Sequence, residues 1–179
     1  ELPLEQDYAI SLLIDLSGSM MGENIEEAYK AVVVLSEALN NIGIKMAVTG
    51  FNNYTSGYKD FDEQYTDEKR KRSERMLRDV TGGTNAAPAV SEVFTKIKKR
   101  PEKKKVIFVF TDGQPNSGPD LKDEVMKVEK SGDVQIIGFG LGSGTEFVAS
   151  YFKDNIVNVS VHELANKLAQ KVRDVIERG

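Results

Sequence analysis

The stretch ISLLIDLSGSMMG, residues 10–22, places an aspartate at the end of an apolar run and two serines directly after it. The apolar run begins at Tyr8, and its length is typical of a strand that is buried on both faces, as in a parallel sheet. A helical pattern follows over residues 22–41, and Gly43 is expected to end it. The sequence therefore predicts a buried strand, a polar loop and a helix in immediate succession.

The rest of the chain repeats this alternation of short apolar strands and longer helices. Further strands are predicted over residues 44–51, 105–111, 134–140 and 156–159, with an antiparallel edge strand over 58–61. Helices are predicted over residues 67–80, 84–99, 119–130, 145–152 and 161–178, the last opened by a capping box of Ser160 and Glu163. Such alternation favours an α/β fold with a mostly parallel sheet and helices on both faces.

Composition limits the classes of function that the chain can serve. Its 179 residues fit a single domain, 1–179, and a chain that begins at Glu1 is expected to be a fragment of a longer protein. The formal charge of −4 argues against a nucleic-acid surface, and no apolar run is long enough for membrane insertion. The absence of cysteine excludes disulfides and thiolate metal sites. We expect a cytoplasmic protein that binds neither nucleic acid nor membrane.

Short oxygen-bearing side chains gather in three loops at predicted strand ends and helix starts. They are Asp15, Ser17 and Ser19 in DLSGSM, Thr84 in TGGTN and Asp112 in FTDGQPN. Each motif alone is also typical of a helix cap or a turn. Together, two carboxylates and three hydroxyls suit Mg²⁺, and Mn²⁺ or Ca²⁺ are alternatives. Because hydroxyls are weak donors, such an ion keeps a water that a partner's carboxylate can replace.

These residues resemble the von Willebrand factor A (vWA) family, whose metal-ion-dependent adhesion site has the pattern Asp-x-Ser-x-Ser, then Thr, then Asp. The resemblance runs from Tyr8 to about Glu177, the expected core of the domain. It implies a Rossmann-like, doubly wound six-stranded sheet with one antiparallel edge strand. It also implies that Ser17, Ser19 and Thr84 ligate the metal and that Asp15 and Asp112 bind it directly or through water.

The resemblance further implies a protein-binding module whose Mg²⁺ is completed by an Asp or Glu of the partner. Within the family, RPEKKKVIFVFTDGQP (100–115) and VNVSVHELANKLAQKVRDVI (157–176) look most like chelatase subunits that work with AAA+ ATPases, so an AAA+ ATPase subunit is the implied partner. Side chains expected to line the rim of the metal site and influence partner choice are Phe51, Asn52, Gln114 and Asn116.

Two other classes of function remain open from the sequence. A secreted or surface adhesin would use the same metal chemistry outside the cell. A metal-dependent hydrolase would let the ion activate water, but it needs a general base, and the single histidine, His162, is predicted in the first turn of the last helix. We therefore expect a binding module rather than an enzyme.

Overall fold

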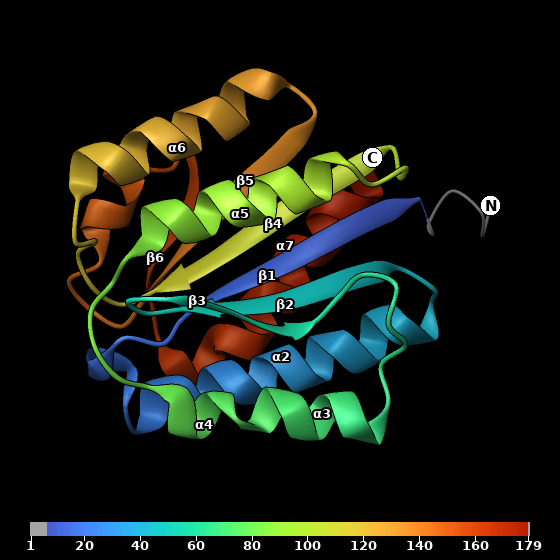
Figure 1. Cartoon of the computed structure of the whole chain (residues 1–179), viewed down its shortest axis with the longest axis horizontal. Helices are drawn as coiled ribbons and strands as arrows, with labels where there is room; N and C mark the ends of the chain where they lie inside the picture. Colours follow the sequence, from blue (N-terminus) through green and yellow to red (C-terminus); the bar gives the residue numbers. More distant parts are fainter. Residues whose placement is uncertain (1–6, 179) are drawn as a thin grey trace.

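The computed structural model describes residues 7–178, so both ends of the predicted domain 1–179 extend outside the described residues. Within this range, strands alternate with helices (Figure 1). The strands are β1 (Tyr8–Asp15), β2 (Lys45–Phe51), β3 (Thr55–Lys59), β4 (Lys104–Thr111), β5 (Val134–Leu141) and β6 (Asp154–Val159). The α-helices are α2 (Glu23–Asn41), α3 (Asp67–Glu74), α4 (Met76–Asp79), α5 (Ala86–Lys98), α6 (Gly118–Ser131) and α7 (Leu164–Arg178), and the 3-10 helices are η1 (Gly18–Met20), η2 (Glu146–Ser150) and η3 (Val161–Glu163).

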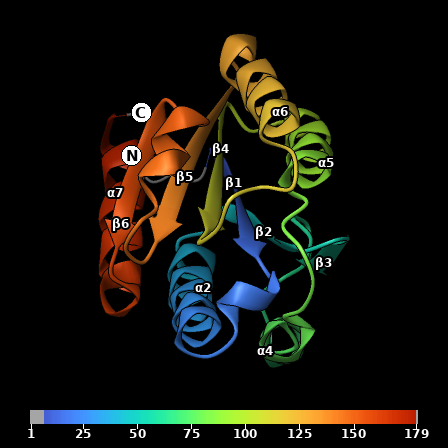
Figure 2. The same ribbon diagram turned by 90° about the vertical axis from the view of Figure 1, so that its left-hand side faces the viewer.

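The strands form one six-stranded sheet in the order β3-β2-β1-β4-β5-β6. All neighbouring strands are parallel except β2 and β3, which pair antiparallel at one edge. This arrangement confirms the predicted Rossmann-like, doubly wound α/β fold. Figure 2 looks toward the end of the sheet where the parallel strands finish and where the loops to the helices begin.

The central strand β1 shows why the sheet needs cover on both faces, since all eight of its residues are buried. Successive side chains of a strand point to opposite faces. Ile10 and Leu12 accordingly join a core with α2 and α7, whereas Ala9 and Leu13 join a second core with α5 and α6. The helices therefore form one layer on each side of the sheet (Figure 1).

Two predictions near the edge strand were wrong in detail. The edge strand β3 begins at Thr55 rather than Tyr58, because the Asn52 side chain accepts a hydrogen bond from the Tyr54 N–H and closes a tight turn that lets pairing resume at once. The predicted helix 67–80 is divided into α3 and α4 at Arg75. There the Arg75 and Arg78 N–H groups bond three residues back rather than four, which interrupts the α-helical pattern.

The predicted capping box at the last helix was also wrong. The Ser160 side chain makes no capping hydrogen bond. The chain instead enters α7 through the 3-10 turn η3, in which the Glu163 N–H donates to the Ser160 carbonyl at 2.9 Å. Likewise, the helix predicted over 145–152 is the shorter 3-10 helix η2. Within residues 7–178, no helix combines the length and apolar character needed to cross a bilayer.

Candidate metal centre

The three predicted loops meet where β1 and β4 end. These strands are parallel neighbours, and Ile14 pairs in register with Phe110. Asp15, the last residue of β1, and Asp112, the residue after β4, therefore emerge at the same edge of the sheet. Ligands of open α/β sheets bind at this carboxyl edge, on the side seen in Figure 2.

Asp15 is fully buried and both of its carboxylate oxygens accept hydrogen bonds. The Ser17 N–H donates to Oδ1 at 2.8 Å, and the Thr111 hydroxyl donates to Oδ2 at 2.7 Å. One bond folds the serine loop back over the end of β1, and the other ties β1 to β4. A carboxylate oxygen has two lone pairs, so each Asp15 oxygen could accept a further hydrogen bond from a water on a metal ion, if one is bound.

A chain of hydrogen bonds joins the two serines to Asp112. The Ser19 hydroxyl donates to Asp112 Oδ1 at 2.7 Å, and the Ser17 and Ser19 hydroxyls are 3.1 Å apart. Because a hydroxyl has a single proton, Ser17 must donate to Ser19. The second Asp112 oxygen, Oδ2, accepts from Asn24 Nδ2 at 2.9 Å. Four of the five predicted ligands thus lie in one contiguous polar cluster.

The loop that carries Thr84 packs against the serine loop. The Gly18 N–H donates to the Gly82 carbonyl at 3.0 Å, which sets residues 81–84 against the serine loop. Gly82 has a φ of +77°, and a side chain there would meet Asn53 at 2.9 Å, so this approach requires glycine. The Thr84 N–H donates to Asn116 Oδ1 at 3.0 Å, while the Thr84 hydroxyl makes no hydrogen bond within the described part of the chain.

The two carboxylates of the cluster, Asp15 and Asp112, would be stabilised by a nearby positive charge. Burial raises the pKa of the Asp15 carboxyl, hydrogen bonds from Ser17 and Thr111 partly oppose this rise, and the neighbouring Asp112 charge adds to it. Among residues 7–178, neither carboxylate lies within ion-pair distance of a Lys, Arg or His. A buried carboxylate without a cationic partner is costly, and a bound cation would remove that cost.

The donor set fits a hard divalent cation. The described residues contain no group of three or more His, Asp or Glu side chains that could hold a metal ion by themselves. Here two carboxylates are supplemented by the hydroxyls of Ser17, Ser19 and Thr84, all oxygen donors, which Mg²⁺ prefers. Ser17 and Thr84 are nearly buried, whereas Ser19 is exposed, so the cluster opens to solvent on one side.

The structure divides the four predicted rim residues. Phe51 was wrongly placed on the rim, because it is fully buried. It is the last residue of β2, opposite Asp15, and strand alternation turns its ring into the core with α5 and α6. Gln114 and Asn116 are exposed beside Asp112, and Asn52 is partly exposed in the β2–β3 turn.

Three supporting residues were missed by the sequence reasoning: Thr111, Asn24 and Asn53. Thr111 precedes Asp112 at the end of β4, so its place in the strand could have indicated it. Asn24 lies in the first turn of α2, and the Asn53 side chain accepts from the Gly83 N–H at 3.0 Å. Neither asparagine belongs to a recognisable motif, and their contacts depend on the packing of distant segments.

Comparison with known proteins agrees with this fold. A family model for the von Willebrand factor type A domain matches residues 9–172. The chain belongs to the von Willebrand factor type A family. Domains of this family are protein-interaction and adhesion modules, and they are generally not enzymes.

The relatives of this vWA domain are distant and mostly longer. A vWA domain-containing protein of Dictyostelium discoideum is 28% identical over 140 residues, which cover 75% of this chain and 15% of that protein. Integrin alpha-X of Mus musculus is 24% identical over 157 residues, 85% of this chain and 13% of the integrin. This vWA domain spans 13–17% of the length of the curated relatives it matches.

A solved structure supports the same fold. The vWF domain of the type V pili tip protein Mfa5 from Porphyromonas gingivalis superposes with a TM-score of 0.74 at 12% sequence identity. The superposition covers 96% of this chain and 97% of that one. At this identity the likeness establishes the arrangement of the vWA sheet and helices.

Proposed function

We propose that this vWA domain is a divalent-metal-dependent protein-binding module, with Mg²⁺ as the ion and Mn²⁺ or Ca²⁺ as alternatives. The supporting observation is the buried Asp15 carboxylate, next to Asp112, with no basic side chain among residues 7–178 at ion-pair distance from either. The hydroxyls of Ser17, Ser19 and Thr84 would complete the protein's share of the ligands. When bound, the ion supplies an electrophilic centre that an acidic side chain of a partner can reach.

Each residue has a distinct task in this proposal. Asp15, held at both oxygens by Ser17 and Thr111, would supply fixed negative charge to the ion. Ser19 and Asp112 lie closer to solvent and face the approaching partner. Because the protein contributes two negative charges to a divalent ion, a third carboxylate from outside meets no net repulsion from the site.

The metal-binding part of the proposal is tested first. Calorimetric titration of Mg²⁺ into the domain should give saturable binding that Asp112→Ala weakens at least about tenfold, with little change in thermal stability. The control variant, Asp133→Ala, removes an exposed carboxylate after α6, near the opposite end of the sheet, and should leave Mg²⁺ affinity unchanged. Equal Mg²⁺ binding by Asp112→Ala and the unmodified domain would contradict the proposed centre.

The partner class has two candidates. Resemblance of residues 100–115 and 157–176 to chelatase subunits supports an AAA+ ATPase subunit inside the cell. The matches to integrin alpha-X and to a pili tip protein support adhesion at a surface instead. Fractionation of cells expressing the full-length protein distinguishes them: recovery with a soluble ATPase complex favours the first, and recovery at the cell surface favours the second.

A further inference from the structure

The turn between β2 and β3 and helix α4 form one continuous surface beside the metal loops. Asn52 Nδ2 donates to the Asp79 carbonyl at 3.2 Å, which fixes the turn to the end of α4. The Gly83 N–H donates to Asn53 Oδ1, which fixes the same turn to the loop that carries Thr84. A partner whose carboxylate reached the metal ion would therefore lie within reach of this surface.

Tyr54 projects from this turn and is 78% exposed. In the described residues, the exposed large hydrophobic side chains are Met21, Val34, Ile42 and Tyr54. Two of these four, Met21 and Tyr54, belong to loops at the metal end of the sheet. Exposed tyrosines beside a binding site are frequent anchors of protein interfaces, because the ring offers a large apolar area at low entropic cost.

Two arginine side chains lie on the same surface. Arg75, at the junction of α3 and α4, and Arg78, within α4, are both exposed and lie one helical turn apart, since the Arg78 N–H donates to the Arg75 carbonyl. Within residues 7–178, neither guanidinium forms an ion pair or a side-chain hydrogen bond. By contrast, Lys69, Arg70 and Arg72 of the preceding helix all pair with Glu63 or Asp67. Glu74 and Asp79 belong to the same segment, so residues 74–79 carry no net charge, but the Asp79 carboxylate is occupied by the Tyr58 hydroxyl and both guanidinium groups stay available to an acidic partner.

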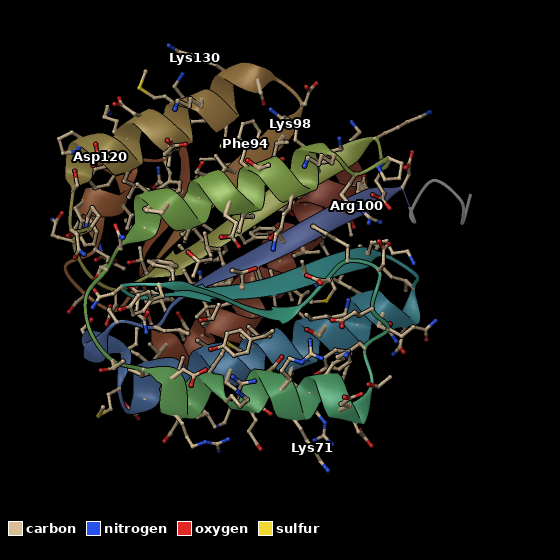
Figure 3. The ribbon with its side chains drawn as sticks, in the orientation of Figure 1. Lys71, Phe94, Lys98, Arg100, Asp120 and Lys130 are labelled. Carbon is tan, nitrogen blue, oxygen red and sulfur yellow. The ribbon has the colours of Figure 1, made fainter. Side chains whose placement is uncertain are left out.

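The side of the metal loops formed by α6 carries mostly negative side chains, since Lys122 lies among Asp120, Asp123 and Glu124 in the first turns of that helix. Helix α6 begins directly after the Asp112 loop, and its first turns carry the exposed Asp120 and Asp123 (Asp120 is labelled in Figure 3). An acidic partner segment would be repelled on the α6 side and attracted on the α4 side. The charge asymmetry thus orients the segment across the site.

We propose that the natural partner is a protein segment with two acidic side chains and one aromatic or aliphatic side chain. The first acidic side chain completes the coordination of the metal ion, and the second pairs with Arg78 and Arg75. The apolar side chain packs on Tyr54. This inference rests on the proposed metal-dependent binding function and specifies the partner that the site selects. The surface that binds the second acid and the apolar side chain consists of Tyr54, Arg75 and Arg78.

Selection from a library of random peptides tests the inference without knowledge of the natural partner. Peptides displayed on phage are bound to the domain in Mg²⁺ and eluted with EDTA, so that metal-dependent binders are recovered. The unmodified domain should enrich peptides that combine two acidic residues with an aromatic or aliphatic residue. The double variant Arg75→Gln/Arg78→Gln should still enrich one acidic residue but lose the preference for the second.

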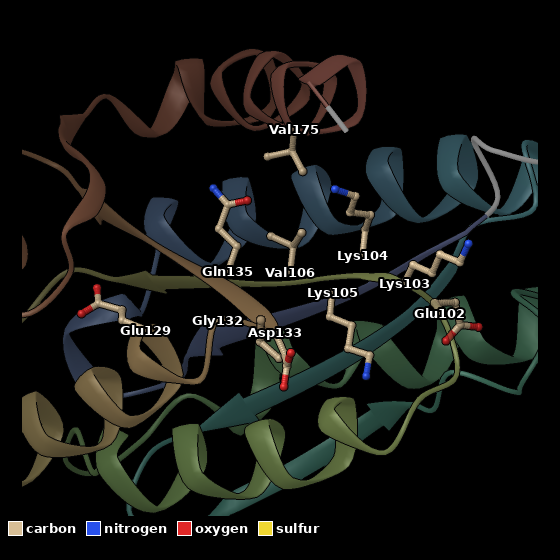
Figure 4. A pocket seen from close by; sticks show the side chains of 11 residues that line it. Glu102, Lys103, Lys104, Lys105, Val106, Glu129, Gly132, Asp133, Gln135 and Val175 are labelled. Atoms are coloured by element: carbon tan, nitrogen blue, oxygen red, sulfur yellow. The ribbon is translucent and has the colours of Figure 1, made fainter.

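Affinities of the enriched peptides provide the quantitative comparison. The double arginine variant should bind them about fivefold more weakly at low salt, and Tyr54→Ser about tenfold more weakly. The matched control, Lys103→Gln/Lys104→Gln, removes two exposed lysines at the opposite end of the sheet, beside a groove of about 660 Å³ (Figure 4), and should leave affinity unchanged. Thermal melting verifies that all variants fold.

Three outcomes are distinguishable. Loss in the arginine and tyrosine variants, with the lysine control unchanged, supports the inference. EDTA-eluted peptides that carry a single acidic residue and bind all variants equally would overturn it, while leaving metal-dependent binding in place. Failure to recover any EDTA-eluted peptide would overturn the proposed function and the inference together.

Discussion

The Asn24 side chain donates a hydrogen bond to Asp112 across the candidate metal centre, with Nδ2 2.9 Å from Oδ2. Asn24 belongs to the first turn of α2, and Asp112 follows β4, 88 residues later. Ser19 occupies the other oxygen of the same carboxylate at 2.7 Å. Asp112 is therefore held at both oxygens, which fixes the direction in which it can offer a lone pair to a metal ion.

Replacing Asn24 should weaken metal binding without unfolding the domain. In Asn24→Ala, Asp112 loses one of its two donors and turns more freely, and loss of such a supporting contact commonly costs about tenfold in metal affinity. Calorimetry with Mg²⁺ measures the change. The control Asn41→Ala removes an exposed asparagine at the other end of α2 and should have no effect. Unchanged affinity in Asn24→Ala would show that Ser19 alone positions Asp112.

Thr111 gives a test of how far a single hydroxyl stabilises the buried Asp15 carboxylate. Thr111→Val keeps the shape of the side chain but removes the hydroxyl that donates to Asp15 Oδ2 at 2.7 Å. A buried charged group that loses a donor costs about 1.5–3 kcal/mol. In EDTA, the free energy of unfolding should therefore fall by about that amount, as measured by urea denaturation.

The matched control for Thr111→Val is Thr95→Val. Thr95 is exposed on α5 and donates only to the Ser91 carbonyl of its own helix, so its loss should change stability by less than about 0.5 kcal/mol. Equal effects of the two substitutions would mean that the Thr111 hydroxyl does not support Asp15.

The order of strands and helices could be predicted from the sequence because buried positions are mostly apolar, and their spacing differs between strands and helices. β1 is buried along its whole length and is apolar along nearly all of it, and the amphipathic α2 lies where its spacing of apolar residues indicates. Ends of elements were less predictable. The hydrogen bond from Tyr54 N–H to Asn52, which starts β3 early, depends on a side-chain choice that hydrophobic pattern does not record.

The candidate site shows the same division between local and non-local information. The carboxyl ends of parallel strands lie at the same edge of a sheet, so the sequence alone could predict that Asp15 and Asp112 lie close together. The burial of Phe51 could not be deduced from its position at a strand end, since it depends on which face of β2 the register assigns to that residue. The contact from Asn24 likewise requires the docking of α2 against the sheet.

The core beneath the site should be sensitive to truncation of a central ring. Phe108 is fully buried in β4, and its ring lies 6.0 Å from that of Phe139. Phe108→Ala should lower the free energy of unfolding by about 3–5 kcal/mol, as measured by urea denaturation. The control Phe94→Ala removes a partly buried ring on α5 that Lys98 covers from outside (Figure 3), and it should cost clearly less. Equal losses would contradict the assignment of Phe108 to the centre of the core.

A buried lysine at the edge strand should make stability depend on alkaline pH. Lys59 is 4% exposed, and its Nζ donates to the carbonyls of Met46 and Asp60 at 2.7 and 2.9 Å. Burial lowers the pKa of Lys59 to about 8 from its ordinary value of 10.5. Between these two values, the unfolded chain binds the proton that the folded domain has released.

The free energy of unfolding should consequently rise with pH above 8, by at most about 1.4 kcal/mol per pH unit for one proton. Burial also raises the pKa of the Tyr65 hydroxyl to about 12, so tyrosine ionisation in the unfolded chain opposes the rise near pH 10. The comparison therefore uses urea denaturation between pH 8 and 9.5. Lys59→Met should remove the rise, whereas Lys71→Met, at an exposed position on α3, should keep it. Parallel pH profiles for Lys59→Met and the unmodified domain would assign the dependence to another group.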